Sequence, residues 1–331
     1  MNTALTNVCN FNCPYCFASE IRSEERVWIT EEQFNEILNF HKVSEQREVR
    51  LIGGEPTLHP EFTKLLNRIV NDDYFIGVML FTNGSFSDEV ATALSLASHV
   101  KHVACLINLN EPNVIGQVMV EKISKNLSTI TRSPMEVTIG VNIYRPDQDV
   151  SYAFETIRAF NVNKALRISV VAPTLETDRS KDPLEYYAAY KPLILDIAQR
   201  ANREGIILSP DCSFIPLCLF SKEELLLMSS VAPDMFNHPV CEPVLDVMPD
   251  GTVVRCFDMS HMRTNIRKFE NDRKIRDYFK EQERKTLQPI TTEACATCPI
   301  YARFGFGCGC KSFDKHSMNK IVEVKEVKVD G

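Results

Sequence analysis

The sequence lacks several features that would place it at once in a broad class. None of its apolar runs approaches the roughly 18 residues that a membrane-spanning helix needs. Residues 1–4 carry no positive charge and no apolar stretch follows them, so no secretory signal is indicated. Basic residues are in the minority, with 37 Lys and Arg against 44 Asp and Glu. We therefore expect a cytoplasmic protein without membrane association, and without general nucleic-acid binding, which needs a basic face.

Cysteine is nearly missing from the middle of the chain. Cys105 is the only one of the 12 cysteines between residues 17 and 211. Three lie within the first 16 residues and eight between Cys212 and Cys310. In a chain without a secretory signal, this distribution favours metal sites over disulfides. Cys105 lies in an apolar run, and we interpret it as a small buried hydrophobic residue.

The first group of cysteines has a defined spacing. Cys9, Cys13 and Cys16 form a C-x3-C-x2-C pattern directly after a short strand-like run at residues 3–6. A structural zinc site is closed by four ligands, so three thiols do not complete one. Three thiolates can instead hold three irons of a 4Fe–4S cluster and leave the fourth iron open to a substrate or cosubstrate. A zinc knuckle with a fourth ligand from elsewhere in the chain is the alternative.

Strand-like and helical patterns alternate six times between residue 3 and about residue 205. At the start of the first helix, Thr30 and Gln33 have the spacing of a capping box. Such alternation is typical of a parallel sheet with helices packed outside it. An open doubly wound sheet and a barrel are both compatible with it. The expected strands are residues 3–6, 48–52, 75–81, 100–109, 136–143 and 165–171.

Polar residues and thiols follow the ends of these expected strands. Cys9 follows the first strand, and Gly53, Gly54 and Glu55 follow the second. Ligands of barrels and of open α/β sheets bind at the carboxyl ends of the strands. The sequence therefore predicts an active site where thiols, a glycine pair and polar side chains meet. The later strands contribute Thr82, Asn83, Asn108, Asn110, Asn142, Arg167 and Ser169.

Two of these motifs resemble those of one enzyme family. The cysteine loop, with the aromatic Tyr15 before its last cysteine, resembles the cluster loop of the radical S-adenosylmethionine (SAM) enzymes. The run Gly53-Gly54-Glu55 resembles the family's GGE motif, which holds the amino group of SAM. The resemblance covers roughly residues 1–170 and implies an α/β fold, a partial (β/α)6 TIM-like barrel.

The resemblance also implies cofactors and ligands. Cys9, Cys13 and Cys16 would bind the SAM-cleaving 4Fe–4S cluster. Two simpler interpretations stay open: the glycine pair can be a tight turn, and Asn142 and Arg167 can serve strand capping and a surface ion pair. The residues expected to contact SAM are Gly53, Gly54, Glu55, Asn83, Asn142 and Arg167.

The composition changes after about residue 205, where helical patterns give way to short strands, prolines and cysteines. Cys241 and Cys256 flank a predicted β-hairpin with an Asp-Gly turn at Gly251, so both thiols can reach one metal centre. This pattern and the following cysteines resemble the SPASM or twitch extension of radical SAM enzymes. We therefore expect a radical SAM partial barrel at residues 1–205 and a small Cys-rich α+β Fe–S domain at residues 206–331.

The number of cysteines in this region suggests auxiliary clusters. Its eight thiols match two 4Fe–4S clusters with four thiolates each. The alternatives are one cluster with spare thiols, or a zinc ribbon on Cys241, Cys256, Cys295 and Cys298. The long gap before Cys308 and the absence of a cysteine after Cys310 depart from the family pattern. The candidate ligands are Cys212, Cys218, Cys241, Cys256, Cys295, Cys298, Cys308 and Cys310.

The resemblance implies an enzyme that cleaves SAM reductively to a 5′-deoxyadenosyl radical, which abstracts a substrate hydrogen. Many SPASM relatives crosslink, epimerise or oxidise ribosomally synthesised peptides, and we expect a peptide substrate. The barrel is expected to begin at residue 3 without a leader-binding domain before it, which weakens that expectation. A small-molecule (sugar or alcohol) dehydrogenase and a non-catalytic Fe–S or zinc protein are the alternatives. A flavodoxin or ferredoxin would supply the electron.

Overall fold

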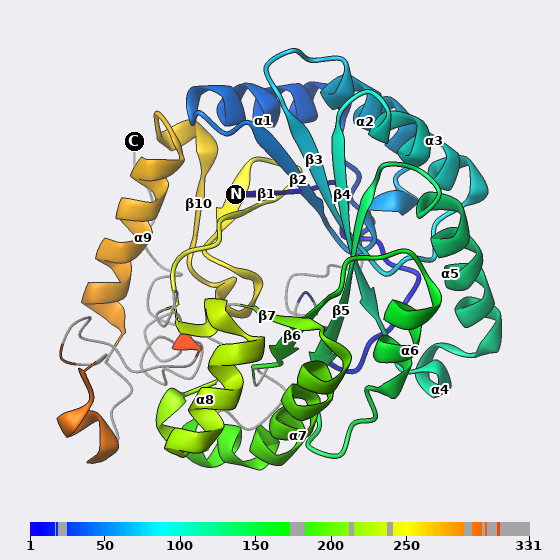
Figure 1. The fold of residues 1–331 in the computed structure, drawn as a ribbon. Helices are drawn as coiled ribbons and strands as arrows, with labels where there is room; N and C mark the ends of the chain where they lie inside the picture. The colour runs from blue at the N-terminus through cyan, green and yellow to red at the C-terminus, as the bar shows by residue number, and fades with distance from the viewer. Residues whose placement is uncertain are drawn as a thin grey trace.

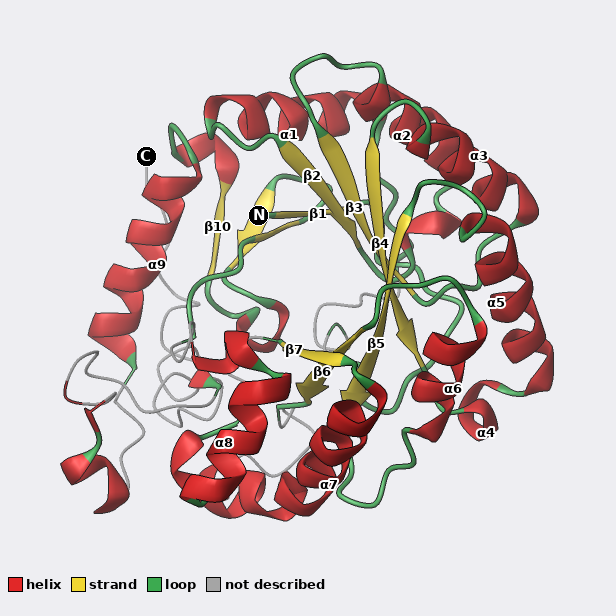
Figure 2. Cartoon of the chain, viewed as in Figure 1, coloured by secondary structure: helices red, strands yellow, loops and turns green. Residues whose placement is uncertain are grey.

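A computed structural model of the chain describes residues 1–16, 18, 25–172, 183–211, 215–236, 241–287, 293–299, 302 and 310–311. These residues form a curved sheet with helices arranged around its outer side (Figures 1 and 2). The sheet has 10 strands in the order β10-β9-β8-β1-β2-β3-β4-β5-β6-β7 and is open between β10 and β7. The fold is therefore α/β, with the partial barrel that the sequence predicts.

Strands β1 to β7 are parallel, and each pairs with its neighbour in the chain. Helices return the chain between them, as parallel pairing requires. The strands are β1 (Asn2–Ala4), β2 (Glu48–Ile52), β3 (Gly77–Thr82), β4 (His102–Leu109), β5 (Glu136–Ile143), β6 (Ala165–Val170) and β7 (Ile207–Pro210). The helices are α1 (Glu31–Val43), α2 (Phe62–Val70), α3 (Asp88–Ser98), α4 (Pro112–Ile115), α5 (Gln117–Ile130), α6 (Ser151–Ala159) and α7 (Pro183–Glu204).

Helix α1 shows how local sequence sets these elements. The Thr30 hydroxyl accepts a hydrogen bond from the Gln33 amide at 3.2 Å, and the Gln33 side chain accepts one from the Thr30 amide at 2.9 Å. This confirms the predicted capping box, which satisfies two backbone donors at the helix start. Phe34, Ile37 and Leu38 then turn one face of the helix toward the sheet, each at most 1% exposed.

The central strands are buried on both faces, as expected of parallel strands covered by helices. In β5, Val137, Ile139 and Val141 are each at most 1% exposed. Cys105 on β4 is also 1% exposed, which confirms its interpretation as a core residue. Burial raises the pKa of its thiol, so this cysteine stays protonated and is not a candidate ligand.

The C-terminal segment extends the same sheet rather than forming a separate one. Strands β8 (Asp246–Val247) and β9 (Thr252–Val254) form the predicted hairpin, with Gly251 at φ +81° in its turn. Strand β8 pairs in parallel with β1, and β9 pairs with β10 (Arg263–Asn265). Strand β7 extends the sheet at its opposite edge. Residues 206–331 thus contribute strands to both ends of the barrel sheet.

Two helices of the C-terminal segment were not expected from the sequence. Helix α8 (Lys222–Val231) begins with a capping box of Ser221 and Glu224, and α9 (Asp272–Thr286) begins after Asn271. Helix α9 directs Ile275, Phe279 and Glu283 inward and lies beside β10 in Figure 1. The short 3-10 helices are Pro56–Leu58, Leu217–Leu219, Pro233–Phe236, Phe257–Met259, Ile266–Lys268 and Glu293–Thr297.

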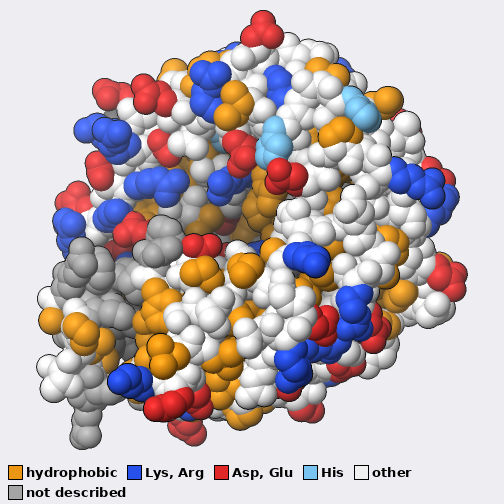
Figure 3. Space-filling view, in the orientation of Figure 1, with side chains coloured by type: hydrophobic (Ala, Val, Ile, Leu, Met, Phe, Trp, Pro, Cys, Tyr) orange, Lys and Arg blue, Asp and Glu red, His pale blue; other side chains and the backbone are white. Residues whose placement is uncertain are grey.

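The surface carries charges of both signs. On the face shown in Figure 3, Lys and Arg alternate with Asp and Glu. Among the described residues, no helix combines the length and the apolar character needed to cross a membrane.

The contact between β8 and β1 contains a buried carboxyl group. Asp246 is 2% exposed, and Asn2 Nδ2 donates to its Oδ1 at 2.7 Å. Burial raises the pKa of Asp246 from 3.8 to about 7. The folded chain therefore keeps a proton that the unfolded chain releases above about pH 4, so this group lowers stability as the pH rises from about 4 to about 7. Its slope approaches about 1.4 kcal/mol per pH unit.

We expect Asp246→Asn to remove this slope, because the amide keeps an acceptor for Asn2 but cannot ionise. Urea unfolding of the iron-free protein at several pH values across this range measures the difference. Wild type should lose stability relative to the variant as the pH rises. Parallel profiles would show that Asp246 has an ordinary pKa in the folded chain.

Candidate active site

The cysteine loop leaves the end of β1 and is closed at its base. Thr6 Oγ1 donates to the Val27 carbonyl at 2.6 Å, and Asn7 Oδ1 accepts from the Val27 amide at 2.8 Å. Cys9, Cys13 and Cys16 are each partly exposed. The Cys16 amide donates to the Cys13 carbonyl at 3.1 Å, which closes a turn. The three thiols therefore belong to one anchored loop at the carboxyl edge of the sheet.

The glycine pair packs directly against the chain leading into this loop. The Gly54 amide donates to the Thr6 carbonyl at 2.8 Å, and the Glu55 amide donates to the Val8 carbonyl at 2.7 Å. A Cβ on Gly54 would lie 2.3 Å from the Val8 carbonyl oxygen, and one on Gly53 2.5 Å from the Thr6 oxygen. Since no side chain fits at such distances, glycine is required at both positions. The sequence predicts that the glycines let a ligand approach the backbone closely. In the structure they let the chain at Thr6 and Val8 approach, and this contact holds the cysteine loop.

Glu55 links the ends of β2 and β3. It is 1% exposed and accepts hydrogen bonds from Thr82 Oγ1 and from the Asn83 amide, both at 2.7 Å, and also from Thr57. Burial raises the pKa of Glu55, although these hydrogen bonds oppose the shift. Glu55 is therefore a fixed part of the site wall.

Asn83 connects the end of β3 with the cysteine loop. Its Nδ2 donates to Asn10 Oδ1 at 2.9 Å and lies 4.0 Å from Cys9 Sγ. Asn10 Nδ2 in turn donates to Ser85 Oγ at 2.8 Å. These contacts confirm that the end of β3 meets the cysteine loop.

The far end of the loop reaches β4 and β5. The Tyr15 hydroxyl donates to Asn110 Oδ1 at 2.5 Å, and Cys13 Sγ lies 3.4 Å from the same oxygen. The Tyr15 ring stacks on Tyr144, with centroids 4.8 Å apart. Burial raises the pKa of Tyr15, while a hydrogen bond with the Asn142 side chain opposes the shift. Asn110 and Asn142 therefore lie at the cysteine loop, as their positions after β4 and on β5 predict.

A partly buried ion pair beside Tyr144 was missed in the sequence. Glu111 is 5% exposed and accepts from Arg145 Nη2 at 2.6 Å and from the Tyr144 hydroxyl at 2.7 Å. Glu111 follows β4, and Arg145 follows β5. The same rule that selected Asn110 and Asn142 could have found both, because each stands just after the end of a parallel strand.

Arg167 on β6 lies on the concave side of the sheet. Its Nη1 donates to Asn108 Oδ1 at 3.3 Å, and its Nη2 forms an ion pair with Asp211, which follows β7. The side chain is 18% exposed. The contact with Asn108 places Arg167 against β4 across the concave side of the sheet.

The cysteines of the C-terminal segment form two groups among the described residues. Arg255 Nη2 donates to Cys241 Sγ at 3.3 Å and Arg255 Nη1 to Cys256 Sγ at 3.6 Å. Burial raises the pKa of Cys256, and the nearby thiols of Cys241 and Cys310 add to this shift. The first group is therefore Cys241, Cys256 and Cys310.

The second group is centred on Cys218. Burial raises the pKa of its thiol, and the thiols of Cys295 and Cys298 contribute to the increase. The Cys298 amide donates to the Cys295 carbonyl at 3.2 Å, so these two cysteines share one turn. Cys212 and Cys308 lie outside the described residues.

The described thiol groups do not have the arrangement of a single-ion metal site. Within the described ranges, no three His, Cys, Asp or Glu side chains converge on one metal position. A 4Fe–4S cluster takes its thiolates on separate irons, so its ligands need not meet at one point. Thiolates are also the soft ligands that iron–sulfur clusters select.

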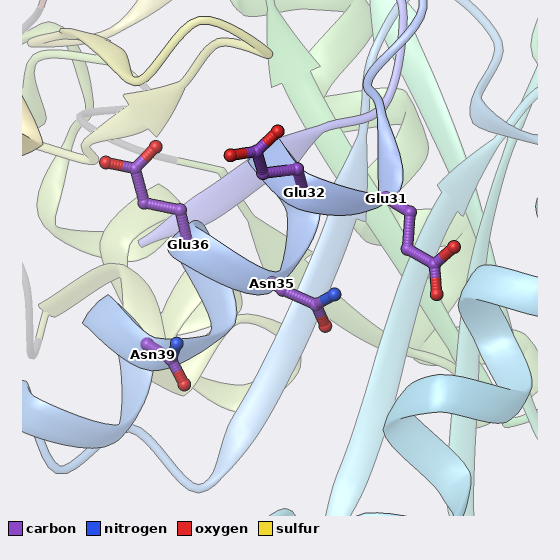
Figure 4. Close-up of a pocket in the computed structure, with 5 residues that line it drawn as sticks. All are labelled: Glu31, Glu32, Asn35, Glu36 and Asn39. Atoms are coloured by element: carbon purple, nitrogen blue, oxygen red, sulfur yellow. The ribbon is translucent and has the colours of Figure 1, made fainter.

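A hollow on the outer side of α1 has a different character. Figure 4 shows its lining residues, all of them acidic or amide side chains on one helix: Glu31, Glu32, Asn35, Glu36 and Asn39. Two of the carboxylates are already paired, Glu31 with Lys64 and Glu36 with Arg267. We assign no chemistry to this hollow.

Comparison with known proteins gives a family match for the N-terminal part of the chain. Residues 3–125 match the family model of the radical SAM superfamily. The "Probable GTP 3',8-cyclase" of Pyrococcus abyssi is 24% identical over 197 residues, which are 58% of this chain and 63% of that protein. The chain thus covers less than two thirds of this relative's length.

Two solved structures share the fold at low sequence identity. SuiB of Streptococcus suis, bound to S-adenosylmethionine, has a TM-score of 0.61 and 12% identity, covering 98% of this chain and 74% of that one. The anSMEcpe structure with bound AdoMet has a TM-score of 0.58 and 16% identity, covering 100% and 97%. The family match thus covers residues 3–125, and the two structures share the partial-barrel fold over nearly the whole chain.

The glycine contact leads to a prediction about the cysteine loop. In Gly54→Ala, the new Cβ would press against the Val8 carbonyl and displace the chain that leads to Cys9. We expect iron per chain, after anaerobic reconstitution, to fall toward the value of a variant in which Cys9, Cys13 and Cys16 are all alanine.

Gly205→Ala is the matched control. An added Cβ there meets nothing within 4 Å, although φ of +66° makes alanine somewhat strained. This variant should lose about 1 kcal/mol of stability and keep its full iron content. Normal iron in Gly54→Ala would mean that the glycine pair does not position the cysteine loop.

Proposed function

We propose that this protein is a radical SAM enzyme that cleaves SAM reductively and abstracts hydrogen from a peptide substrate. The observation that carries the proposal is the contact of one anchored loop, holding Cys9, Cys13 and Cys16, with the ends of β2, β3, β4 and β5. An electron-transfer or scaffold protein would not require a polar site built around its cluster.

The residues at this edge have separate roles in the proposed enzyme. The three thiolates would hold a 4Fe–4S cluster, which supplies the electron for cleavage of SAM to methionine and a 5′-deoxyadenosyl radical. Gly54 and Glu55 keep the loop at the sheet edge through their backbone amides, and Gly53 packs closely against Thr6. Asn83, Asn142 and Arg167 offer amide and guanidinium groups to the polar parts of SAM. Buried Tyr15, stacked on Tyr144, closes one side of the site.

A peptide substrate is supported by what the similar structures contain. One SuiB structure is bound to the precursor peptide SuiA, and one anSMEcpe structure contains AdoMet and the Cp18Cys peptide. The second candidate is a small-molecule substrate, favoured by the curated relatives that are named GTP 3′,8-cyclases.

The second part of the proposal concerns two auxiliary 4Fe–4S clusters. One would use Cys241, Cys256 and Cys310, and the other Cys218, Cys295 and Cys298. Cys212 and Cys308 are the two remaining thiols, one for each cluster. Cys241 and Cys256 share the guanidinium group of Arg255, whereas Cys295 and Cys298 act on Cys218, and we therefore favour two clusters over a zinc ribbon made of these four.

The first test concerns SAM cleavage. We expect the variant with Cys9, Cys13 and Cys16 all changed to alanine to make no 5′-deoxyadenosine from SAM under dithionite, because no open iron site remains. A Cys105→Ala variant is the control and should retain activity, since that thiol lies in the core. Anaerobic incubation followed by chromatography measures the product. Undiminished 5′-deoxyadenosine from the triple variant would refute the ligand assignment.

The second test counts the clusters. Three 4Fe–4S clusters amount to about twelve irons per chain, and the triple variant should retain about eight. About four irons in that variant would show a single auxiliary cluster. Zinc in place of iron would exclude auxiliary clusters.

The substrate class is tested by mass spectrometry. The reconstituted enzyme is incubated with SAM, dithionite and, in separate reactions, candidate peptides encoded beside its gene and GTP. A SAM-dependent mass change of a peptide supports the proposal. Turnover of GTP without any peptide modification would favour the small-molecule alternative.

A further inference from the structure

Arg255 is a fully buried cation between two candidate cluster ligands. Its side chain is 0% exposed, and it is among the largest fully buried side chains of the described residues. One guanidinium nitrogen donates to Cys241 Sγ at 3.3 Å and another to Cys256 Sγ at 3.6 Å. The first also donates to the Cys241 carbonyl at 3.2 Å. The planar fork of an arginine can serve several acceptors at once in this way.

Arg255 shares one buried carboxylate with a second cation. Its Nε forms an ion pair with Glu283 on α9, which is 2% exposed. The other oxygen of Glu283 accepts from Lys311 Nζ at 2.7 Å. Two cations therefore share one carboxylate, and Asp258 adds a negative charge near Cys256. Because this group is buried, water and salt screen it little.

Burying a charged side chain costs free energy unless neighbouring groups accept its hydrogen bonds or carry the opposite charge. Burial alone would lower the pKa of Arg255, but Cys241, Cys256 and Glu283 raise it well above its usual range. Without such partners, a buried arginine would lose its hydration and gain nothing in return. The thiols of Cys241 and Cys256 are thus as much a part of its environment as Glu283.

We propose that Arg255 tunes the auxiliary centre at Cys241 and Cys256, donating N–H···S hydrogen bonds to the ligand sulfurs and raising the reduction potential of the centre. The inference rests on the proposed auxiliary cluster. Adding one electron to a cluster adds negative charge, and donors to the sulfurs and nearby positive charge stabilise the reduced form. Arg255 and Lys311 act in this direction, whereas Glu283 acts against them.

The proposal predicts the direction in which each substitution shifts the reduction potential, and these directions can be tested. In the variant that lacks Cys9, Cys13 and Cys16, only auxiliary centres remain, and their potentials are measured by a dithionite titration followed by electron paramagnetic resonance. We expect Arg255→Met and Lys311→Met to lower the midpoint potential of one centre. Glu283→Gln, of nearly the same shape, should raise it. The second centre, at Cys218, Cys295 and Cys298, should keep its potential as an internal reference.

A matched control is the exposed pair of Arg267 and Glu36, whose side chains are 55% and 39% exposed. Arg267→Met should leave both potentials unchanged, because solvent screens that pair. If Arg255→Met does not retain iron, Glu283→Gln and Lys311→Met still give the opposite shifts expected of charge.

The outcomes separate this inference from the proposed function. Shifts in the same direction for Glu283→Gln and Lys311→Met, or no shift at all, would overturn the role of the Arg255 group while leaving the cluster in place. No iron in the triple cysteine variant would overturn the auxiliary clusters and this inference together. Iron content is measured on every variant, so the two failures are distinguishable.

Discussion

A backbone contact between two loops holds the candidate site together. The amides of Gly54 and Glu55 donate to the carbonyls of Thr6 and Val8, which join the loop after β2 to the chain that carries the first cysteines. No side chain could fit between them, as the 2.3 Å approach of a Gly54 Cβ to Val8 shows. This contact, together with the links through Asn83 and Tyr15, sets the position of the cysteine loop relative to the sheet. The glycines therefore act on the metal site through the backbone, whether or not they also touch SAM.

Hydrogen bonds along the strand ends connect this contact to the rest of the site. Glu55 fixes the end of β3 through Thr82 and Asn83, and Tyr15 reaches Asn110 after β4. Each link satisfies a buried polar group that would otherwise cost free energy. The result is a continuous network from β2 to β5 that keeps the loop in place at the carboxyl edge.

The C-terminal segment is built into the same architecture. Its hairpin pairs with β1, the strand that leads to the cysteine loop, while α9 supplies Glu283 to Arg255 beside the hairpin thiols. One sheet therefore carries both the first cysteine loop and the hairpin between Cys241 and Cys256. We regard this shared sheet as the physical basis for a fixed relation between the proposed SAM site and the proposed auxiliary centre.

The sequence was informative where the signal is local. The expected strands at 48–52 and 136–143 have the bounds of β2 and β5, and the α1 capping box and the hairpin turn are as expected. Helix α9 was missed because its sequence is dominated by charges, and only Ile275, Tyr278 and Phe279 mark its apolar face. For α8, the Ser221 and Glu224 capping box was a visible signal that we did not use.

The features that could not be predicted from the sequence are contacts between residues that lie far apart in the chain. From the sequence alone, an arginine such as Arg255 is expected at the surface. In the structure it is buried against Glu283, which lies on a helix that was not expected. The strand-end rule could have selected Glu111 and Arg145, but their pairing across two different strands is visible only in the structure. The glycine pair resembled a ligand cradle, and only the structure reveals its contact with Thr6 and Val8.

The most direct measurement of the central claim is electron–nuclear double resonance on the reduced protein with isotope-labelled SAM. If the loop of Cys9, Cys13 and Cys16 holds a cluster with one iron open to SAM, the nitrogen label of the SAM amino group will couple to the cluster spin. The coupling should disappear in the variant with those three cysteines changed to alanine, while auxiliary cluster signals remain. A reduced wild-type protein with a full complement of iron and no coupling to labelled SAM would contradict the account.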